Sequence, residues 1–307
     1  MNRLKNILVG VDFSDCSKAA LTQAARLAQW NGARLHVVHI LESLVMSEFA
    51  DSLKVSVIEL RDITLGRATE KLRAWVTELN LRNEPTMDVG FGAPIDVMLS
   101  KIHSVNADLL VLGEVGSSLP GRGAGILAGK CLRKAPCKVM LVNEDHDRAF
   151  RVVLACIDFS ETSRVVAMQA LHVATADQSQ LHFLHVFDPP WRRLGYLRPI
   201  PEAAPDFQKQ YRDTLRYRLE QFVGDTGGLN IRCDLHEASS TGSGITDFAR
   251  LLHADLIVLG TRGKTNLKYV LLGSTAERLL RDVPCSILAI KPPDLDTTAS
   301  STTQPAP

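Results

Sequence analysis

Short apolar runs rich in β-branched residues alternate along the chain with longer stretches in which apolar residues recur at a helical period. Near the start, ILVGV is followed by the helical pattern of SKAALTQAARLAQW and then by the apolar run LHVVHI. Uninterrupted apolar runs of this length are typical of strands buried on both faces, and helices between them favour parallel pairing. Five such strands can be traced in each half. The pattern predicts a doubly wound α/β fold, in which helices cover both faces of a parallel sheet.

The same pattern of strands and helices occurs twice. Four blocks recur in the same order: KNILVGVDFS as RVVLACIDFS, LHVVHI as LHFLHV, ADLLVLG as ADLIVLG, and LRKAPCKVMLV as LRDVPCSILAI. Repeats of this length are whole domains, because solenoid units span only about 20 to 50 residues. We therefore predict two similar domains, at residues 1–146 and 147–292, followed by a polar tail at 293–307 that we expect to be disordered.

The last apolar run of each half, KVMLVN and SILAIK, would form a strand at the edge of its sheet. An exposed apolar edge strand invites aggregation. We therefore expect these two strands to cover each other's edges, so that the chain mimics a dimer by itself.

The stretch that follows the fourth strand of the second half carries the main functional signal. The apolar run ADLIVLG passes directly into glycines at the spacing G-x2-G-x9-G-S, formed by Gly260, Gly263, Gly273 and Ser274. Glycine lacks a Cβ atom, so backbone N–H groups in such a loop can approach a ligand closely. The helical pattern that begins at Ser274 adds a helix start, which favours a surface anion by about 0.3–1 kcal/mol. The loop predicts a nucleotide phosphate site; the alternative is a connection in which glycine only turns the chain and Ser274 only caps the helix.

The topology of such a sheet predicts where the rest of the ligand would lie. Ligands of doubly wound sheets bind past the carboxyl ends of the strands, where the winding reverses. Asp158 ends the first strand of its half, and Gly260 ends the fourth. A nucleotide that bridges these two ends would place its base near Asp158 and its phosphates in the glycine loop.

Composition bounds the remaining classes of function. With 307 residues, of which 45% are apolar and 22% charged, the chain can bury two ordinary cores. Its formal net charge of +1 gives no electrostatic reason to expect nucleic acid or an anionic membrane as a partner. The apolar runs are far shorter than the roughly 20 residues that span a bilayer, and MNRLKNILVGVDFS leads into a strand rather than a signal peptide. We expect no membrane association and a cytoplasmic location.

Motifs of several other site classes are missing from the sequence. No G-x4-G-K motif followed by Ser or Thr is present, and no G-x-G-x-x-G joins a first strand to its helix. The six cysteines form no C-x2-C pair, and no Asp, His and Glu cluster has metal-ligand spacing, so we expect no metal site. His39 and His185 lie inside strands and are expected to be hydrogen-bonded core residues. No general base, nucleophile pair or carboxylate pair stands out, so we expect no catalytic residues and no enzyme.

These motifs together resemble the universal stress protein family in its tandem two-domain form. The resemblance covers approximately residues 3–143 and 150–291. It rests on the VDFS and IDFS strand ends, the HV step of the second strand, ADLIVLG, the glycine loop and VPCSILAI. It implies the strand order 3-2-1-4-5 in each five-stranded sheet. It also implies ATP binding, together with Mg²⁺, in members whose glycine loop is intact.

The resemblance implies a role for each matching residue of the second half. Asp158 and Val186 would contact the adenine, and Gly260 with Gly263 would contact the ribose and the first phosphates.

At the outer end of the site, Gly273, Ser274 and Thr275 would hold the remaining phosphates. The family match requires neither Arg262 nor Lys264, but both lie within the loop, where they could add charge-assisted contacts to phosphate oxygens. The alternative for these two cations is a solvated loop charge without a ligand.

The first half departs from this pattern at the loop. Gly113 and Gly116 are present, but Gly125 comes one residue early and is followed by Ile126, where a hydroxyl is expected. An apolar β-branched side chain offers no phosphate contact and would crowd an anion. We expect this first site to be weak or empty despite Asp12.

The leading hypothesis is an ATP-binding stress-response protein whose second domain binds the nucleotide in a regulatory rather than catalytic role. Two alternatives remain at this point. One is an interaction or scaffold module that acts through a protein partner or a homodimer, with incidental nucleotide binding. The other is a slow ATP hydrolase, which needs a positioned base that the sequence does not reveal.

Overall fold

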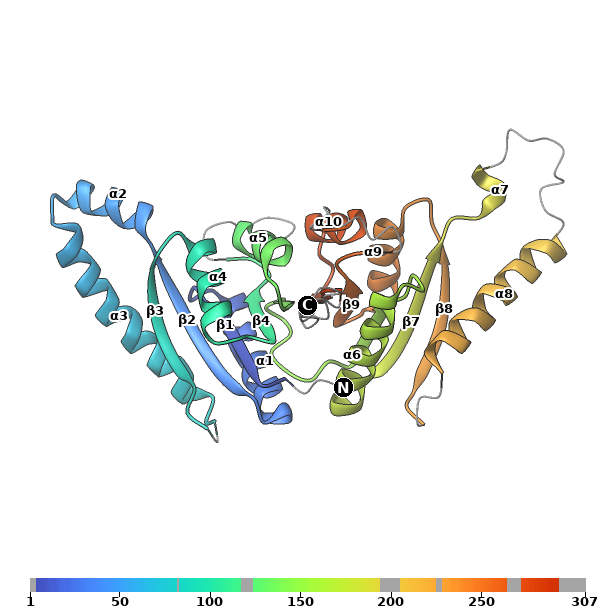
Figure 1. Ribbon diagram of the computed structural model, residues 1–307, viewed down its shortest axis with the longest axis horizontal. Helices are drawn as coiled ribbons and strands as arrows, with labels where there is room; N and C mark the ends of the chain where they lie inside the picture. Colours follow the sequence, from blue (N-terminus) through green and yellow to red (C-terminus); the bar gives the residue numbers. More distant parts are fainter. Residues whose placement is uncertain are drawn as a thin grey trace, which may run out of the picture.

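The computed structural model forms an elongated molecule in which the two halves of the chain lie side by side (Figure 1). The structure describes residues 4–81, 83–116, 124–193, 205–224, 228–263 and 272–292. Lys264 and the tail at 293–307, for which disorder is predicted, lie outside the described residues.

Each half alternates strands and helices as the apolar pattern predicts. The elements of the first half are β1 (Asn6–Val11), α1 (Asp15–Asn31), β2 (Arg34–Glu42), α2 (Ser43–Leu53), α3 (Val57–Glu78), β3 (Thr86–Gly92), α4 (Pro94–Ser104), β4 (Leu109–Gly113), α5 (Ile126–Lys134) and β5 (Lys138–Val142). The elements of the second half are β6 (Val152–Cys156), α6 (Glu161–Asp177), β7 (Gln180–Phe187), α7 (Pro190–Arg193), α8 (Pro205–Val223), β8 (Ile231–Glu237), α9 (Thr241–Leu252), β9 (Leu256–Gly260), α10 (Ser274–Arg281) and β10 (Ser286–Ile290).

The described strands form one sheet in the order β3-β2-β1-β4-β5-β10-β9-β6-β7-β8. Within each half all pairings are parallel, and the order is 3-2-1-4-5. The predicted fold class, two doubly wound α/β domains, is therefore confirmed. In this order β1 and β4 are neighbours, as are β6 and β9, so the ends that carry the predicted site lie next to each other.

The two half-sheets are joined through their last strands. β5 and β10 pair antiparallel, with Leu141 opposite Ile287 and Met140 opposite Leu288. The expectation that these two strands cover each other's edges is confirmed. The pairing lies at the centre of the molecule, while α2 with α3 and α7 with α8 lie at its two ends (Figure 1).

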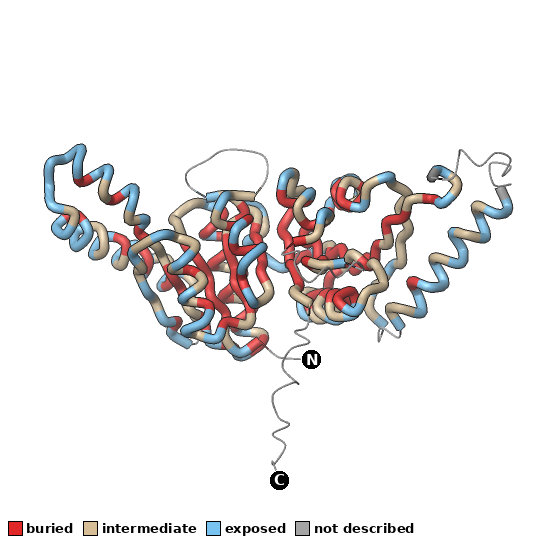
Figure 2. Tube along the Cα trace, turned by 45° about the horizontal axis from the view of Figure 1, so that its top comes forward, coloured by how far each residue is buried: buried red, intermediate tan, exposed pale blue. Residues whose placement is uncertain are grey.

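Two hydrophobic cores lie on opposite faces of this sheet. Along β1, Val9 belongs to one core and Leu8 to the other, because successive side chains of a strand point to opposite faces. The first core is covered by α1, α3, α6 and α8, and the second by α4, α5, α9 and α10. Each core contains residues of both halves, so the halves share their buried surface (Figure 2).

Candidate functional site

The carboxylate of Asp158 is fixed just beyond the end of β6. Its Oδ1 atom accepts hydrogen bonds from the Ser160 backbone N–H (3.0 Å), the Ser160 hydroxyl (2.6 Å) and the Ser163 hydroxyl (2.5 Å). Ser160 is also the N-cap of α6, since its hydroxyl accepts from the Ser163 backbone N–H. The cap and the carboxylate therefore hold each other in one orientation.

The second carboxylate oxygen of Asp158 lies against the glycine loop. A Cβ atom at Gly263 would lie 2.8 Å from Asp158 Oδ2, closer than non-bonded atoms can approach. Only glycine fits here without a shift of the carboxylate or the loop. The structure thus brings together Asp158 and Gly263, which the topology places at neighbouring strand ends.

The backbone is strained at Phe159, the residue directly after Asp158. Its φ of 63° is in the left-handed region, which costs a bulky residue about 1–3 kcal/mol. The ring packs on His185, with centroids 4.5 Å apart, and the Arg218 guanidinium lies 4.3 Å above it. His185 Nδ1 in turn lies 2.8 Å from the carbonyl oxygen of Ile157. His185 is therefore a hydrogen-bonded structural residue, as predicted, and it holds the strand end in place.

On the far side of the site, the loop after β9 folds back on itself. A Cβ atom at Gly260 would lie 2.8 Å from Thr162 Cγ2 and 3.1 Å from the carbonyl oxygen of Arg262. The Gly273 N–H donates to the Thr261 carbonyl oxygen over 2.8 Å. These contacts bring the two described ends of the loop together at the end of β9.

Helix α10 begins at this point. Gly273 occupies the N-cap position and supplies no capping side chain, while Ser274 is exposed and Thr275 half-buried in the first turn. Uncapped N–H groups of a first turn are available to an anion. The acidic residue of that turn, Glu277, is turned to the other half of the molecule, with Oε1 3.7 Å from Arg133 Nε.

Val186 occupies a different environment. Its side chain is buried beneath the start of α9, where a Cβ atom at Gly244 would lie 2.7 Å from Val186 Cγ1. In the sheet it pairs with His236 of β8. The β6–β7 register, in which Cys156 lies opposite Leu184, leads Val186 toward the strand end that carries Asp158.

Two residues missed by the sequence reasoning also belong to this region. Thr261 is only 1% exposed, and within the described part of the chain its buried hydroxyl has no hydrogen-bond partner. Lys291, directly after β10, donates from Nζ to the carbonyl oxygen of Leu132 at the end of α5 (2.5 Å). Burial lowers the pKa of Lys291 to about 8, and the nearby Arg262 cation contributes to the lowering. The sequence could have pointed to both residues. Aligning the two halves places Thr261 opposite Glu114 and Lys291 opposite Asn143, so the residue type differs at each of these positions.

The first half repeats the carboxylate geometry. Asp12 Oδ1 accepts from the backbone N–H and the hydroxyl of Ser14, at 3.1 and 2.6 Å. A Cβ atom at Gly116 would lie 2.8 Å from Asp12 Oδ2. Phe13 has φ 64° and packs on His39, whose Nδ1 atom lies 2.7 Å from the Val11 carbonyl oxygen. His39 is therefore a hydrogen-bonded structural residue, as predicted.

Charge distinguishes the two halves. Glu114 stands where the second half has Thr261, and its buried carboxylate accepts from the Asn143 side chain over 2.9 Å. Burial raises the pKa of Glu114, and the neighbouring Glu144 raises it further. Helix α5 begins with Ile126, which is 67% exposed. The first half therefore has Glu114 and Ile126 where the second half has the hydroxyl residues Thr261 and Ser274.

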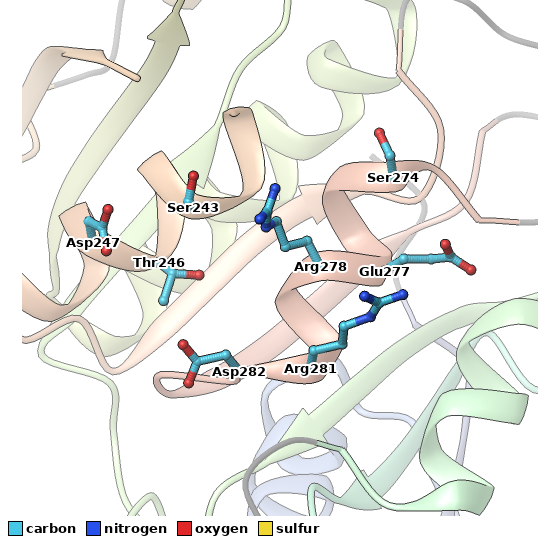
Figure 3. A pocket seen from close by; sticks show the side chains of 8 residues that line it. All are labelled: Ser243, Thr246, Asp247, Ser274, Glu277, Arg278, Arg281 and Asp282. Carbon is cyan, nitrogen blue, oxygen red and sulfur yellow. The ribbon is translucent and has the colours of Figure 1, made fainter. Parts of the chain in front are cut away.

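Beside α10 lies a groove of about 570 Å³ (Figure 3). It is lined by Ser243, Thr246, Asp247, Ser274, Glu277, Arg278, Arg281 and Asp282. Arg278 reaches from α10 toward α9 and donates to the Ser240 hydroxyl over 2.9 Å. Both carboxylates and guanidinium groups line the groove, so it does not present a single sign of charge to a ligand.

The described part of the chain contains neither a metal-ligand cluster nor a helix that could span a membrane. No group of three or more His, Cys, Asp or Glu side chains there is arranged to hold a metal ion. None of the described helices is both long and apolar enough to cross a bilayer.

Comparisons with known proteins agree with this architecture. The family model of the universal stress proteins matches residues 3–143 and again residues 149–291. A universal stress protein from Mycolicibacterium smegmatis is 26% identical over 298 residues, which cover 93% of this chain and 97% of that protein.

Solved structures of similar proteins share the fold. A universal stress protein from Archaeoglobus fulgidus matches with a TM-score of 0.62 at 17% identity, covering 93% of this chain and 96% of that one. A putative universal stress protein from Pseudomonas aeruginosa gives a TM-score of 0.61, also at 17% identity, with 94% of each chain covered. The chain belongs to the universal stress protein family and carries two copies of the family's domain in tandem.

Proposed function

We propose that this protein binds an adenine nucleotide, with ATP as the leading candidate, in its second half, and that binding serves a regulatory rather than catalytic role. The observation that carries the proposal is the contact between Asp158 and Gly263 at the neighbouring ends of β6 and β9. A carboxylate held in one orientation beside a close-packed backbone loop can accept from the amino group of a base while the loop approaches the sugar and phosphates.

The start of α10 suits the phosphates. Gly273 leaves the approach to the first turn open, and Ser274 and Thr275 offer hydroxyls beside the N–H groups of that turn. Arg262 adds a cation at the end of β9. Mg²⁺ would arrive with the nucleotide and be held largely by phosphate oxygens and water, as is usual for this ion.

The polar groups around Asp158 already take part in structural hydrogen bonds, which favours a regulatory role over a catalytic one. His185 lies next to this strand end. Its Nδ1 atom is within hydrogen-bond distance of the Ile157 carbonyl oxygen, and its ring packs against Phe159. Asp158 Oδ1 is occupied by three donors. These groups hold the site's shape, which is what a binding device requires.

Titration calorimetry and thermal unfolding with ATP and Mg²⁺ test the proposal. One nucleotide per chain is expected. With ATP at about 100 times Kd, the folded chain gains about 2.7 kcal/mol, which corresponds to a rise in Tm of several degrees.

The chain offers a matched pair of variants for this test. Gly273 and Gly125 hold the same position before α10 and α5, and the negative φ of both suits valine; a Cβ atom would lie 3.3 Å from the Thr261 carbonyl oxygen at Gly273 and 3.5 Å from the Glu114 carbonyl oxygen at Gly125. Gly273→Val should abolish the ATP-dependent shift because the side chain fills the approach to the phosphates, whereas Gly125→Val should leave it unchanged. An equal shift in both variants would contradict the assignment to the second half, and no shift in the wild-type protein would contradict nucleotide binding.

A further inference from the structure

Large apolar side chains are exposed together at one end of the molecule. Of the thirteen exposed large hydrophobic residues in the described part of the chain, seven lie within residues 44–63, so they form a patch rather than a scatter. These seven are Leu44, Val45, Phe49, Leu53, Val55, Ile58 and Ile63. Helix α2, its connection to α3 and the first turns of α3, which carry them, project from the body of the molecule (Figures 1 and 2). Contiguous exposed apolar surface of this kind marks an interaction site.

The internal packing of the α2–α3 tip does not use this patch. A small separate core of Leu41, Met46, Ala50 and Leu60 attaches the tip to the rest of the first half. Val45, Phe49 and Leu53 lie outside that core at steps of four residues, so they form a continuous stripe along α2. Helix α2 is therefore apolar on two adjoining faces, one of which is buried within the chain and the other left uncovered.

We propose that a second copy of this chain covers the stripe, through antiparallel packing of α2 against α2 about a two-fold axis. Val45 and Leu53 are equidistant from Phe49, so this arrangement places Phe49 of both copies near the axis. Val45 of each copy then opposes Leu53 of the other. Such a contact uses the same patch on both molecules and closes after two copies.

Charge at the ends of α2 selects the antiparallel orientation. Glu42 holds the N-cap position and Lys54 the C-cap position, and both are exposed. Antiparallel packing brings Glu42 of each copy to Lys54 of the other. Parallel packing would instead oppose two glutamates at one end and two lysines at the other, which is unfavourable.

The size of the patch suits a pair of modest affinity. Fifteen of residues 44–63 are exposed in each copy, fewer than the roughly 20–30 residues a side that standard interfaces use. The patch also lies at the outer end of the first half, far along the sheet from the β5–β10 pairing at the centre (Figure 1). The contact therefore adds to the internal pairing of the two halves instead of competing with it.

Sedimentation equilibrium of the full chain between about 1 and about 100 μM, where dimers of modest affinity dissociate, is the first test. The wild-type protein should shift from monomer to dimer within this range. Phe49→Glu should remain monomeric, because it places two carboxylates at the axis. Leu251→Glu is the matched control, since Leu251 is 76% exposed on α9 and lies outside the patch. Circular dichroism should confirm that both variants keep the wild-type fold.

Charge reversal tests the orientation. Glu42→Lys and Lys54→Glu should each weaken the dimer at least tenfold, and the double variant should recover wild-type affinity because the pair is restored with opposite polarity. Dimerisation that Phe49→Glu leaves intact would overturn the proposal. So would a wild-type monomer throughout the range, including one whose patch binds phospholipid vesicles instead. Failure of the double variant to recover would rule out the antiparallel arrangement.

Discussion

Asp158 shows how one side chain can be both part of the scaffold and part of the candidate site. Oδ1 accepts three hydrogen bonds from Ser160 and Ser163, which orients the carboxylate, and Oδ2 faces the loop at Gly263. The two oxygens therefore have separable roles. Asp12 keeps a similar arrangement with Ser14 and Gly116 in the half whose loop departs from the pattern, so the carboxylate geometry alone does not distinguish the two halves.

Replacing Asp158 by asparagine and by alanine should separate these roles. Asp158→Asn retains an acceptor for the serine donors, so stability should change little while ATP affinity falls, because the side chain now presents an amide donor to the base. Asp158→Ala should lose both, with a stability cost of about 1–3 kcal/mol for the unpaired donors. Urea unfolding and calorimetry measure the two quantities, and Asp12→Asn is the control, for which unchanged ATP affinity is expected. Full ATP affinity in Asp158→Asn would remove Asp158 from the site.

At the scale of elements, the segment between β5 and β6 is held by side-chain hydrogen bonds to both halves of the chain. The Gln23 side chain of α1 donates to the carbonyl oxygens of His146 and Arg148, at 2.8 and 2.6 Å. His146 Nδ1 lies 2.8 Å from the Ser286 hydroxyl of β10, and its Nε2 lies 3.6 Å from Asp255. The connection is therefore a packed element that ties the two halves together.

This segment should make stability depend on pH. Burial lowers the pKa of His146 below its usual value of about 6.5, although Asp255 opposes the shift. Its stabilising contribution is complete above the unfolded pKa and is lost as the pH falls through the folded pKa, because the unfolded state takes up the proton first. The free energy of unfolding should thus fall between pH 7 and pH 5, and His146→Asn should show a shallower decline. His103→Asn, at an exposed histidine of α4, should keep the wild-type slope; equal slopes in the two variants would contradict this role.

The whole molecule is held together by one sheet and by two cores that each cross the junction of the halves. Phe150, at the start of the second half, is 1% exposed and belongs to a core that also contains α1 and β1. Its N–H donates to Asp177, and the Arg26 guanidinium of the first half lies 5.3 Å above its ring. The halves should therefore unfold as one cooperative unit.

Phe150→Ala tests this cooperativity. The cavity should lower the free energy of unfolding by about 3–5 kcal/mol while the transition stays single. Phe207→Ala, at a phenylalanine that is 52% exposed on α8, should cost much less. Calorimetry that resolves two transitions, with only one of them shifted by Phe150→Ala, would show that the halves are independent.

Patterns that repeat along the chain could be read from the sequence, and contacts set by single side chains could not. Matching apolar runs predicted the two similar domains and the pairing of β5 with β10, because buried strands need both faces and edges covered, whereas the strand order came from the family resemblance. The buried states of Thr261 and Glu114 depend on packing that no spacing encodes. Family resemblance assigned Val186 to the adenine, which stays a prediction; its packing against Gly244 of α9, which is distant in sequence, could not be read from the residue spacing.

The antiparallel pairing of β5 with β10 within one chain also determines which copies of the domain are assembled together. Free subunits with such complementary strands would pair at random, so that like pairs of each kind would accompany the mixed pair. A single polypeptide makes the mixed pair every time. A change in one copy is then always presented beside the other copy, in a ratio of one to one that expression levels cannot disturb.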